Sequence, residues 1–242
     1  MTQKCAALIL SAEIFVANIS HELKTPIGVL SILSEAVLGA ADDPEAIARF
    51  ANKMQLEAKR LSDLVQEIIN LSRLQDTDPL KNPSDVNLDE ILKEAIDQSR
   101  LSAEKRKIEI VYSKQSPGMI KGDARQVEMA LSNLIENAIN YSSEGTRVAV
   151  ALKQNDALTE VSVTDQGIGI PEKELERIFE RFYRVDPARS RETGGTGLGL
   201  SIVKHVATNH GGDVYVWSVE GAGSTFTIRF PTTPHLSAVE DK

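Results

Sequence analysis

Residues 6–40, AALILSAEIFVANISHELKTPIGVLSILSEAVLGA, carry the pattern that decides the first half of the fold. Apolar side chains recur in this stretch at spacings of mostly three, four or seven residues, as they do on one face of a long helix. The members of this stripe are Val16, Ile19, Leu23, Ile27, Leu30 and Val37. Residues 6–40 are therefore predicted to form one long helix.

A second helix is predicted after the break at residues 39–44. Asp43 followed by Pro44 is a helix-start signal, because proline fits the first turn of a helix. A second apolar stripe then continues to about residue 74, through Ile47, Phe50, Met54, Leu61, Val65, Ile68 and Leu71. Two arms of roughly 45 Å, at about 1.5 Å per residue, cannot cover both stripes by themselves. Pairing with a second copy into a four-helix bundle would cover them, so a homodimer is expected.

The pattern changes after a polar, proline-bearing linker at residues 77–85. Further helices are predicted over residues 88–101, 122–140 and 200–210. Short strands are predicted over residues 108–112, 119–120, 148–152, 161–163, 214–216 and 225–230. Most of these strands are joined by hairpins, so the sheet should be mixed. The predicted fold class is α+β, with a helical hairpin at 1–76, an α/β sandwich at 86–232 and a tail at 233–242.

The composition is that of an ordinary soluble chain, with 41% hydrophobic and 26% charged residues, and it excludes a disordered or collagen-like protein. The 35 acidic residues outnumber the 27 basic ones, and the net charge of -8 disfavours a nucleic-acid partner. The single Cys5 excludes an internal disulfide framework and a multi-thiolate zinc site. No apolar run approaches the roughly 18 residues of a membrane span. We therefore expect a cytoplasmic chain, with any membrane anchor in a segment outside this sequence.

Two glycine-rich segments could approach a nucleotide: DQGIG at residues 165–169, after a predicted strand, and GGTGLG at residues 194–199, before a predicted helix. Neither is a Walker-type loop, because no Lys-Ser or Lys-Thr follows the glycines. The second is no dinucleotide fingerprint either, because no strand directly precedes it and its spacing is G-x-G-x-G. Glycines let backbone N–H groups approach phosphates, and a helix N-terminus favours anions. Tight turns are the alternative. They would not explain Asp165 at the end of an apolar strand, where a desolvated carboxylate needs a donor such as an exocyclic amine.

Asn133 and Asn137 lie four residues apart, and hence on one face of the helix predicted over 122–140. Their amides could be satisfied groups of the core. Their oxygens would equally suit a hard cation such as Mg²⁺, which prefers oxygen ligands and retains waters beside phosphate. The spacing leaves both interpretations open, while Glu136 falls on a neighbouring face and is expected to be solvated.

His21 begins the segment HELKTP, residues 21–26, inside the first predicted helix. A zinc protease would need a second histidine at position 25, where Thr25 stands, so that site is excluded. An isolated histidine on a helix is more often a plain surface residue. Pro26 argues for a functional site, because proline inside a helix removes a backbone hydrogen bond at a cost of roughly 3 kcal/mol, and such local violations cluster where function requires them.

Five segments together resemble the H, N, G1, F and G2 boxes of sensor histidine kinases, in the order of that family. They are FVANISHELKTP (15–26), NLIENA (133–138), DQGIG (165–169), IFERFY (178–183) and GTGLG (195–199). The resemblance extends from about residue 12 to residue 231. It implies a dimerisation and histidine-phosphotransfer hairpin joined to a Bergerat-type ATP-binding domain. Among such kinases, the chain is most similar to the actinobacterial phosphate-responsive sensors.

The resemblance implies a role for each matching residue of the hairpin. His21 would be the phosphoacceptor. Glu22 would hold the ring tautomer and accept its proton as the ring nitrogen attacks the γ-phosphate of ATP. Thr25 would orient a water molecule when the kinase works in reverse as a phosphatase.

The resemblance also implies the nucleotide contacts. Asn137 would bind Mg²⁺ with support from Asn133, Tyr141 would border the phosphates, and Asp165 would read the adenine amino group. Arg184 is the cation expected to reach the γ-phosphate. The remaining matching residues would frame and anchor a mobile lid over residues 171–194. They are Gly167, Gly169, Phe179, Phe182, Gly195, Gly197 and Gly199.

Two positions bear on the reaction. Related ATPases carry a water-activating carboxylate where this chain has Asn133, and an amide cannot act as that base, so hydrolysis should be slow. Asn140 stands where many family members carry a lysine that touches phosphate. The absence of that lysine would weaken ATP binding by about 1–2 kcal/mol.

The resemblance therefore implies an ATP-dependent protein-histidine kinase that phosphorylates His21 and passes the phosphoryl group to an aspartate of a response regulator. Two alternatives remain open. The first is a degenerate kinase that holds ATP and a partner as a scaffold, and the second is a plain ATPase of the same fold. Intact His21, Glu22 and Asn137 count against the scaffold.

Overall fold

The computed structural model describes residues 2–75, 80, 83–186 and 195–232, with side chains from residue 15 onward. The chain divides into two compact units, one of Met1–Asn70 with Ser190–Thr196, the other of Leu71–Arg189 with Gly197–Lys242. Parts of three predicted segments lie outside the described residues. They are the tail at 233–242, residues 77–79, 81 and 82 of the linker, and residues 187–194 of the lid. The predicted domain limits stay a prediction.

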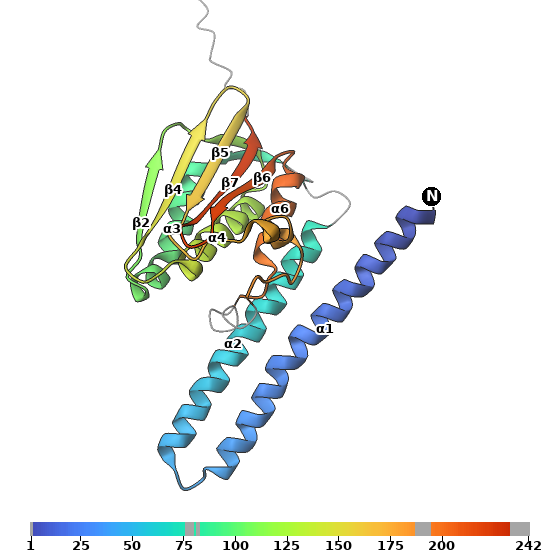
Figure 1. The fold of residues 1–242 in the computed structure, drawn as a ribbon, viewed down its shortest axis with the longest axis vertical. Coiled ribbons are helices and arrows are strands. Elements are labelled where there is room, and N and C mark those ends of the chain that lie inside the picture. The colour runs from blue at the N-terminus through green and yellow to red at the C-terminus, as the bar shows by residue number, and fades with distance from the viewer. Residues whose placement is uncertain (1, 76–79, 81–82, 187–194, 233–242) are drawn as a thin grey trace, which may run out of the picture. The chain divides into compact units, whose positions relative to one another are not determined.

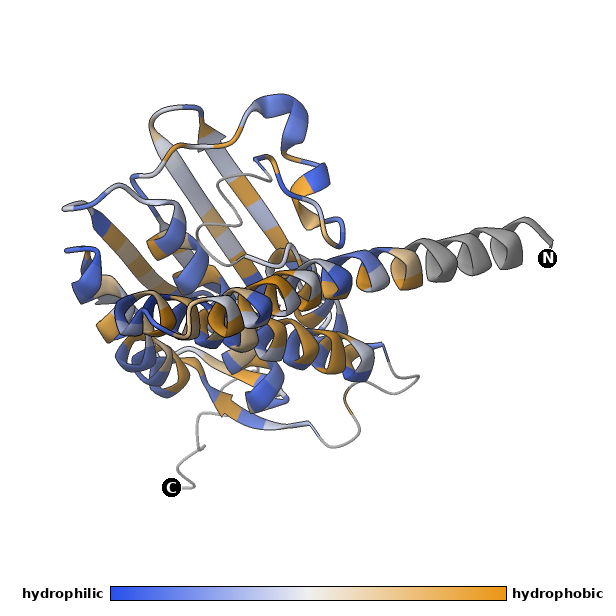
Figure 2. Cartoon of the chain, turned by 90° about the horizontal axis from the view of Figure 1, so that it is seen from below, coloured by the Kyte–Doolittle hydropathy of each residue, from blue (hydrophilic) through white to orange (hydrophobic). Residues whose placement is uncertain are grey.

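The first unit contains the two predicted helices, α1 (Thr2–Gly39) and α2 (Pro44–Leu74). Asp43 caps the start of α2, because its Oδ1 accepts a hydrogen bond from the backbone N–H of Ala46 at 3.0 Å. An aspartate before the first turn satisfies an N–H group that has no partner within the helix, so the helix start at Asp43–Pro44 is confirmed. Figure 2 shows apolar and polar segments alternating along the two helices.

Several large apolar side chains on this hairpin are exposed to solvent. Ile32 is 67% exposed on α1, and Leu56 is 63% exposed on α2. The other large exposed apolar side chains of the hairpin are Val16, Ile27, Val29, Leu38, Val65 and Ile69. Of these eight residues, Val16, Ile27 and Val65 belong to the predicted stripes, and the other five lie outside them. A single hairpin therefore leaves apolar surface uncovered, although most members of the stripes are at least half-buried. None of the helices among the described residues combines the length and the apolar character that crossing a membrane requires.

The second unit is an α/β sandwich. Its sheet has the order β2 (Glu109–Lys114), β4 (Arg147–Gln154), β5 (Leu158–Thr164), β7 (Gly223–Pro231) and β6 (Asp213–Val219). The β2–β4 pair is parallel and the other pairs are antiparallel, which confirms the predicted mixed sheet. Helices α3 (Leu88–Lys105), α4 (Ala124–Tyr141) and α6 (Gly199–Asn209) lie on one side of the sheet (Figure 1).

The core lies between these helices and the sheet. Leu131, Leu134 and Ile135 of α4 are buried, as are Ile202 and Val206 of α6. The strands contribute the buried residues Val148, Val150, Leu152, Val161, Val163, Phe226, Ile228 and Phe230. Alternate residues of β4 and β5 are buried, which is the pattern of a sheet with one covered face. Packing against the sheet fixes α4 and α6 as rigid supports for the residues that they carry.

A strand that the sequence did not predict, β1 (Ser84–Asn87), pairs antiparallel with β3 (Met119–Gly122). Of its four residues only Val86 is buried, so the stretch shows no alternation from which a strand could be read. The structure also adds two 3-10 helices, η1 (Glu172–Glu174) and η2 (Arg177–Phe179), in the segment before the lid.

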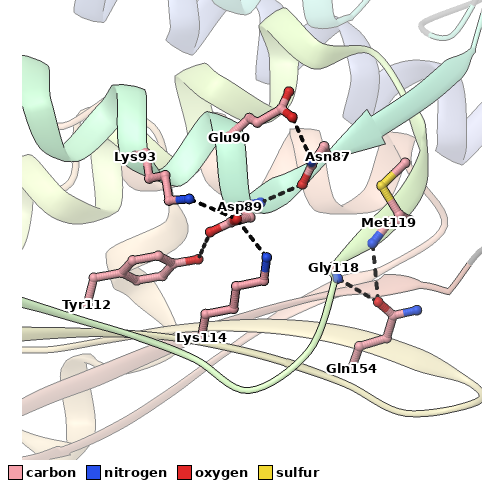
Figure 3. Close-up of polar contacts among 9 residues, drawn as sticks. All are labelled: Asn87, Asp89, Glu90, Lys93, Tyr112, Lys114, Gly118, Met119 and Gln154. Atoms are coloured by element: carbon pink, nitrogen blue, oxygen red, sulfur yellow. Dashed lines mark hydrogen bonds and ion pairs between the residues drawn. The ribbon is translucent and has the colours of Figure 1, made fainter.

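A buried carboxylate joins α3 to β2 (Figure 3). Asp89 is 6% exposed, and its oxygens accept hydrogen bonds from Lys93 at 3.0 Å, Lys114 at 2.7 Å and the Tyr112 hydroxyl at 2.8 Å. The hydrogen bond from Lys114, more than the other contacts, lowers the pKa of Asp89 to about 2. The carboxylate is therefore ionised in the folded protein and ties the first turn of α3 to the edge strand of the sheet.

Candidate functional site

The first candidate group, His21, lies on α1 with its side chain 80% exposed. Its Nδ1 is 3.8 Å from Oε1 of Glu22, which is longer than a hydrogen bond but places the carboxylate on the Nδ1 side of the ring. Thr25, one turn further on, donates its hydroxyl to the backbone carbonyl of His21 at 3.3 Å. Pro26 is buried within α1, so the helix continues through a residue that has no backbone N–H. The three predicted residues of the hairpin thus lie together on one helix.

The second candidate group is Asp165, at the end of β5. It is 6% exposed, and its Oδ1 accepts the backbone N–H groups of Gly167 at 2.8 Å and Ser224 at 3.2 Å. Its own N–H donates to the carbonyl of Ser224 at 2.9 Å, which ties the loop to β7. Among the described residues no contact of Oδ2 is recorded. The second oxygen is therefore available to a donor from a ligand.

Burial raises the pKa of Asp165, and the two backbone hydrogen bonds from Gly167 and Ser224 oppose that effect. A perturbed carboxyl in a desolvated position is a common feature of a functional site. It also agrees with the argument from sequence that a carboxylate at the end of an apolar strand needs a hydrogen-bond donor.

Helix α4 carries the other polar candidates. Asn133 donates its amide N–H to the carbonyl of Met129 at 2.8 Å, so part of this amide is satisfied within the helix. For Asn137, which is half-buried, the structure records no side-chain hydrogen bond with any described residue. The amide oxygen of Asn137 is therefore open to a ligand, and Glu136 beside it is exposed as expected.

Both glycine segments contact α4 so closely that a side chain at Gly167 or Gly199 would displace atoms of that helix. A Cβ atom on Gly167 would lie 2.4 Å from the carbonyl oxygen of Tyr141, at the end of α4. A Cβ atom on Gly199 would lie 2.4 Å from Oδ1 of Asn133. The structure thus places Gly199 against Asn133 and Gly167 against Tyr141, about 12 Å apart along α4, with Asp165 hydrogen-bonded to Gly167.

Gly169 has a different reason to be glycine. Its φ of +68° favours glycine, and a Cβ atom there would lie 2.1 Å from the carbonyl oxygen of Val219 in β6. Ser218 accepts a hydrogen bond from the backbone N–H of Ile170 at 2.8 Å, which attaches the same loop to β6. The sequence analysis missed Ser218 and Ser224, because only the glycines of the β6–β7 turn hinted at a constrained connection.

A residue within the predicted lid is joined to the glycine segment that follows the lid by a backbone hydrogen bond, from the N–H of Phe182 to the carbonyl of Gly197 at 2.8 Å. Both residues have positive φ, +64° for Phe182 and +77° for Gly197. Bulky residues rarely adopt such a conformation, and they do so mainly where the surroundings enforce it. Arg184 and Gly195 each lie two residues away along the chain, from Phe182 and Gly197 respectively, and both are half-buried.

A further cluster, which the sequence analysis did not single out, holds η1 and η2 together. The Tyr183 hydroxyl donates a hydrogen bond to Glu174, and the Arg177 guanidinium lies over the Tyr183 ring at 4.1 Å from its centroid. Arg177 also lies within ion-pair distance of Glu174 and Glu180. This first part of the predicted lid is thus ordered by its own side chains.

A divalent cation would find few protein ligands in this unit. The described residues contain no group of three or more His, Cys, Asp or Glu side chains placed to hold a metal ion. Mg²⁺ bound with a nucleotide needs only one or two protein oxygens, because phosphate oxygens and waters fill its other positions. The open amide oxygen of Asn137 fits that requirement.

Two family models match the chain. Residues 122–234 match the histidine kinase-, DNA gyrase B- and HSP90-like ATPase family, and residues 11–77 match the His Kinase A (phospho-acceptor) domain. The chain belongs to the sensor histidine kinases of two-component systems. The sensor-like histidine kinase SenX3 of Mycolicibacterium smegmatis is 47% identical over 228 residues, which are 94% of this chain. The chain spans 59% of the length of that relative.

Solved structures of sensor histidine kinases share the fold. The mycobacterial sensor histidine kinase MprB is 32% identical, with a TM-score of 0.55 over 63% of this chain and 99% of that chain. Histidine kinase ThkA in complex with response regulator protein TrrA is 24% identical, with a TM-score of 0.76 over 96% of this chain and 65% of that chain. The second similarity concerns the fold alone. The predicted order of a helical hairpin followed by an α/β sandwich is confirmed.

Proposed function

We propose that this sensor histidine kinase chain uses ATP to phosphorylate itself on His21. The observation that carries the proposal is the presence, in one chain, of an exposed His21 beside Glu22 and a glycine-lined site around Asp165 and α4. The first group is a nucleophile with a base next to it, and the second is a site suited to a purine and its phosphates.

The position of Glu22 on the Nδ1 side of the His21 ring supports the following transfer. Nε2 of His21 attacks the γ-phosphorus, so an N–P bond forms while the bond from that phosphorus to the bridging oxygen breaks and ADP leaves. The proton on Nδ1 passes to Glu22, which lies 3.8 Å away and must approach by under 1 Å to form a hydrogen bond. Glu22 thereby keeps Nε2 unprotonated before the attack and neutralises the ring after it.

On the nucleotide side, Oδ2 of Asp165 would accept a hydrogen bond from the adenine amino group, while Oδ1 keeps its two hydrogen bonds from backbone N–H groups. Asn137 would hold Mg²⁺, whose charge offsets that of the phosphates. Tyr141 would border the phosphates, and Arg184 would reach the γ-phosphate. Asn133 cannot act as a base, so transfer to His21 is favoured over hydrolysis. The glycines of both segments would let backbone N–H groups approach the phosphates.

Two partners follow from the same proposal. The exposed apolar side chains of α1 and α2 would be covered by a second copy in a four-helix bundle. The phosphoryl group would pass to an aspartate of a response regulator, and the solved complex of ThkA with TrrA supports that class of partner. Thr25 would serve the reverse reaction on the regulator. A cytoplasmic location, membrane attachment through a segment outside this chain and the phosphate-responsive subfamily stay predictions.

The experiment that separates the proposal from its alternatives compares two rates in purified protein with γ-labelled ATP. Transfer predicts that label enters the protein with little release of free phosphate. A plain ATPase would release phosphate steadily with no matching incorporation, and a scaffold would bind ATP without either event. Adding the receiver domain of a response regulator should then remove the label from the kinase.

A further inference from the structure

His210 is the residue at which α6 ends and against which α4 begins. It is 6% exposed, and its ring meets the Phe230 ring edge-on with centroids 5.6 Å apart. Nδ1 lies 2.8 Å from the carbonyl oxygen of Val206, and Nε2 lies 3.0 Å from the backbone nitrogen of Asp123. None of the roles proposed above uses this buried ring.

The two neighbours of the ring fix its protonation state. The Val206 carbonyl can only accept a hydrogen bond, and the Asp123 backbone N–H can only donate one. Nδ1 must therefore carry the ring hydrogen, while Nε2 must be bare, and this describes the neutral imidazole. In the imidazolium form Nε2 would also carry a hydrogen, directed at the N–H of Asp123, and this bond would be lost.

Two close contacts mark where α4 and α6 meet. Just before α4, a Cβ atom on Gly122 of β3 would lie 2.3 Å from the His210 ring, and at the start of α6 a Cβ atom on Gly199 would lie 2.4 Å from Asn133 of α4. Asp123 is the N-cap of α4, and at 1.5 Å per residue Asn133 lies about 15 Å further along the axis. A shift of α4 at Asp123 is therefore transmitted along the helix to Asn133.

We propose that His210 is a positioning residue of the nucleotide site. Through Asp123 it holds α4 in the axial register that presents Asn133 to Gly199 at the start of α6 and carries Asn137 one turn further along the same helix, and only the neutral imidazole does so. The inference rests on the proposed binding of ATP by this unit.

The charge environment favours the neutral form. Burial lowers the pKa of His210, and the Val206 carbonyl and the Asp123 charge oppose this effect. Of the groups recorded against the ring in the described chain, Asp123 from α4 carries a charge, while Val206 on α6, Gly122 on β3 and Phe230 on β7 carry none. The folded pKa lies below the ordinary value of 6.5. The register is thus intact above pH 6.5 and is lost as the pH falls through the lowered value.

Two variants of the full chain separate positioning from simple packing. His210→Phe keeps the ring and its contact with Phe230 but offers no acceptor to Asp123. We expect it to bind a non-hydrolysable ATP analogue with Mg²⁺ about 10-fold more weakly than wild type, because a buried N–H is left unpaired. His210→Gln offers an amide oxygen near the position of Nε2 and does not titrate, so it should bind the analogue nearly as wild type does.

The pH profile provides the readout that packing alone would not change. The ratio of wild-type to His210→Gln affinity should be constant above about pH 6.5 and should fall as the pH drops through the lowered pKa of His210, since the titration of the nucleotide itself cancels in the ratio. His205→Gln is the matched control, because His205 lies on the same helix but contacts Arg181 instead. In that variant the acid loss of affinity should persist.

A second change tests the same contact from the other side. Gly122→Ala should displace the His210 ring and weaken binding of the analogue. In a protein that already carries His210→Ala, the same change should reduce the affinity little further, because the obstructing ring atoms are gone. Additive losses from Gly122→Ala and His210→Ala would overturn the inference, as would a wild-type acid step retained in His210→Gln.

NMR decides the register claim even if the analogue does not bind. The ring nitrogens of wild type should report the neutral Nδ1–H form, and the Asp123 amide should lose protection from hydrogen exchange in His210→Phe. An Nε2–H ring, or an Asp123 amide equally protected in both proteins, would overturn the inference. Wild type that fails to bind the analogue would instead contradict the proposed function.

Discussion

The amide oxygen of Asn133 on α4 occupies the space that a Cβ atom of Gly199 would need, with only 2.4 Å between the two atoms. Gly199 is the first residue of α6, so this contact sets the distance between the two helices that border the glycine segment. Because the obstructing atom is the end of a side chain, added bulk at Gly199 would displace the Asn133 amide before it disturbed the backbone.

Gly199→Ala should therefore weaken ATP binding by about 10-fold while leaving thermal stability nearly unchanged, since one polar contact is misplaced and the core is not. Calorimetric titration with Mg-ATP and a thermal melt measure the two quantities. Gly39→Ala is the matched control, because nothing lies within 4 Å of a Cβ atom at that position. Equal affinities for Gly199→Ala and Gly39→Ala would show that the Asn133–Gly199 contact has no role in the site.

Asp165→Asn should separate binding from stability. An amide at this position can keep the Oδ1 bonds but presents N–H groups in place of Oδ2, so we expect at least 10-fold weaker ATP binding. Burial raises the folded pKa of Asp165 above its ordinary 3.8, so the wild-type fold loses stability as the pH rises from about 3.8 through the raised value. The asparagine variant lacks that loss and should melt at a higher temperature than wild type at neutral pH.

The exposed Asp156 in the β4–β5 turn supplies the control for this pair of measurements. Asp156→Asn should change neither ATP affinity nor the melting temperature at neutral pH. An Asp165→Asn protein that bound ATP as tightly as wild type would remove Asp165 from the adenine contact.

Most of the fold was readable because its periodic stretches are long. The two stripes of α1 and α2 and the amphipathic α4 each repeat over several turns, and Asn155 closes the β4–β5 turn by accepting the N–H groups of Ala157 and Leu158. The strand β1 and the 3-10 helices η1 and η2 are three or four residues long, so they present too few buried positions to form a pattern.

The candidate site was readable where residue type alone limits the chemistry, as for His21, Asp165 and the glycines. Ser218 and Ser224 were not readable, because they meet the loop at Asp165 only after β6 and β7 have joined the sheet. His210 was missed for the same reason, since its partner Asp123 is distant in sequence and becomes a neighbour only when α4 and α6 pack together.

The buried Asp89 should matter for stability more than a surface acid on the same helix. Asp89→Ala leaves Lys114 and Tyr112 without their shared acceptor, so we expect a loss of about 2–4 kcal/mol in the free energy of unfolding. Because the folded pKa is lowered from 3.8 to about 2, the wild-type advantage should be present above pH 3.8 and disappear towards pH 2.

Urea denaturation of the full chain at several pH values measures this effect. Asp97→Ala is the matched control on α3, since its ion pair with Arg100 is exposed and should be worth at most about 1 kcal/mol. Similar losses for Asp89→Ala and Asp97→Ala would contradict the structural role of the buried carboxylate.

The exposed apolar side chains of the hairpin predict the oligomeric state. Ile32→Glu should convert the dimer into a monomer, because it would bury a charge at the helix interface. Leu101→Glu, an equally apolar and exposed position on α3, should leave the dimer intact. Analytical ultracentrifugation distinguishes the two states, and a monomeric wild type or a dimeric Ile32→Glu protein would contradict the four-helix bundle.

The most direct test of the central claim is to incubate the full chain with γ-labelled ATP and Mg²⁺ and to follow the label on the protein. The account predicts a label on wild type that acid removes and base does not, as expected for a phosphorus–nitrogen bond, and no label on His21→Gln. A wild-type protein that stays unlabelled while binding ATP, or a His21→Gln protein that is labelled equally, would contradict it.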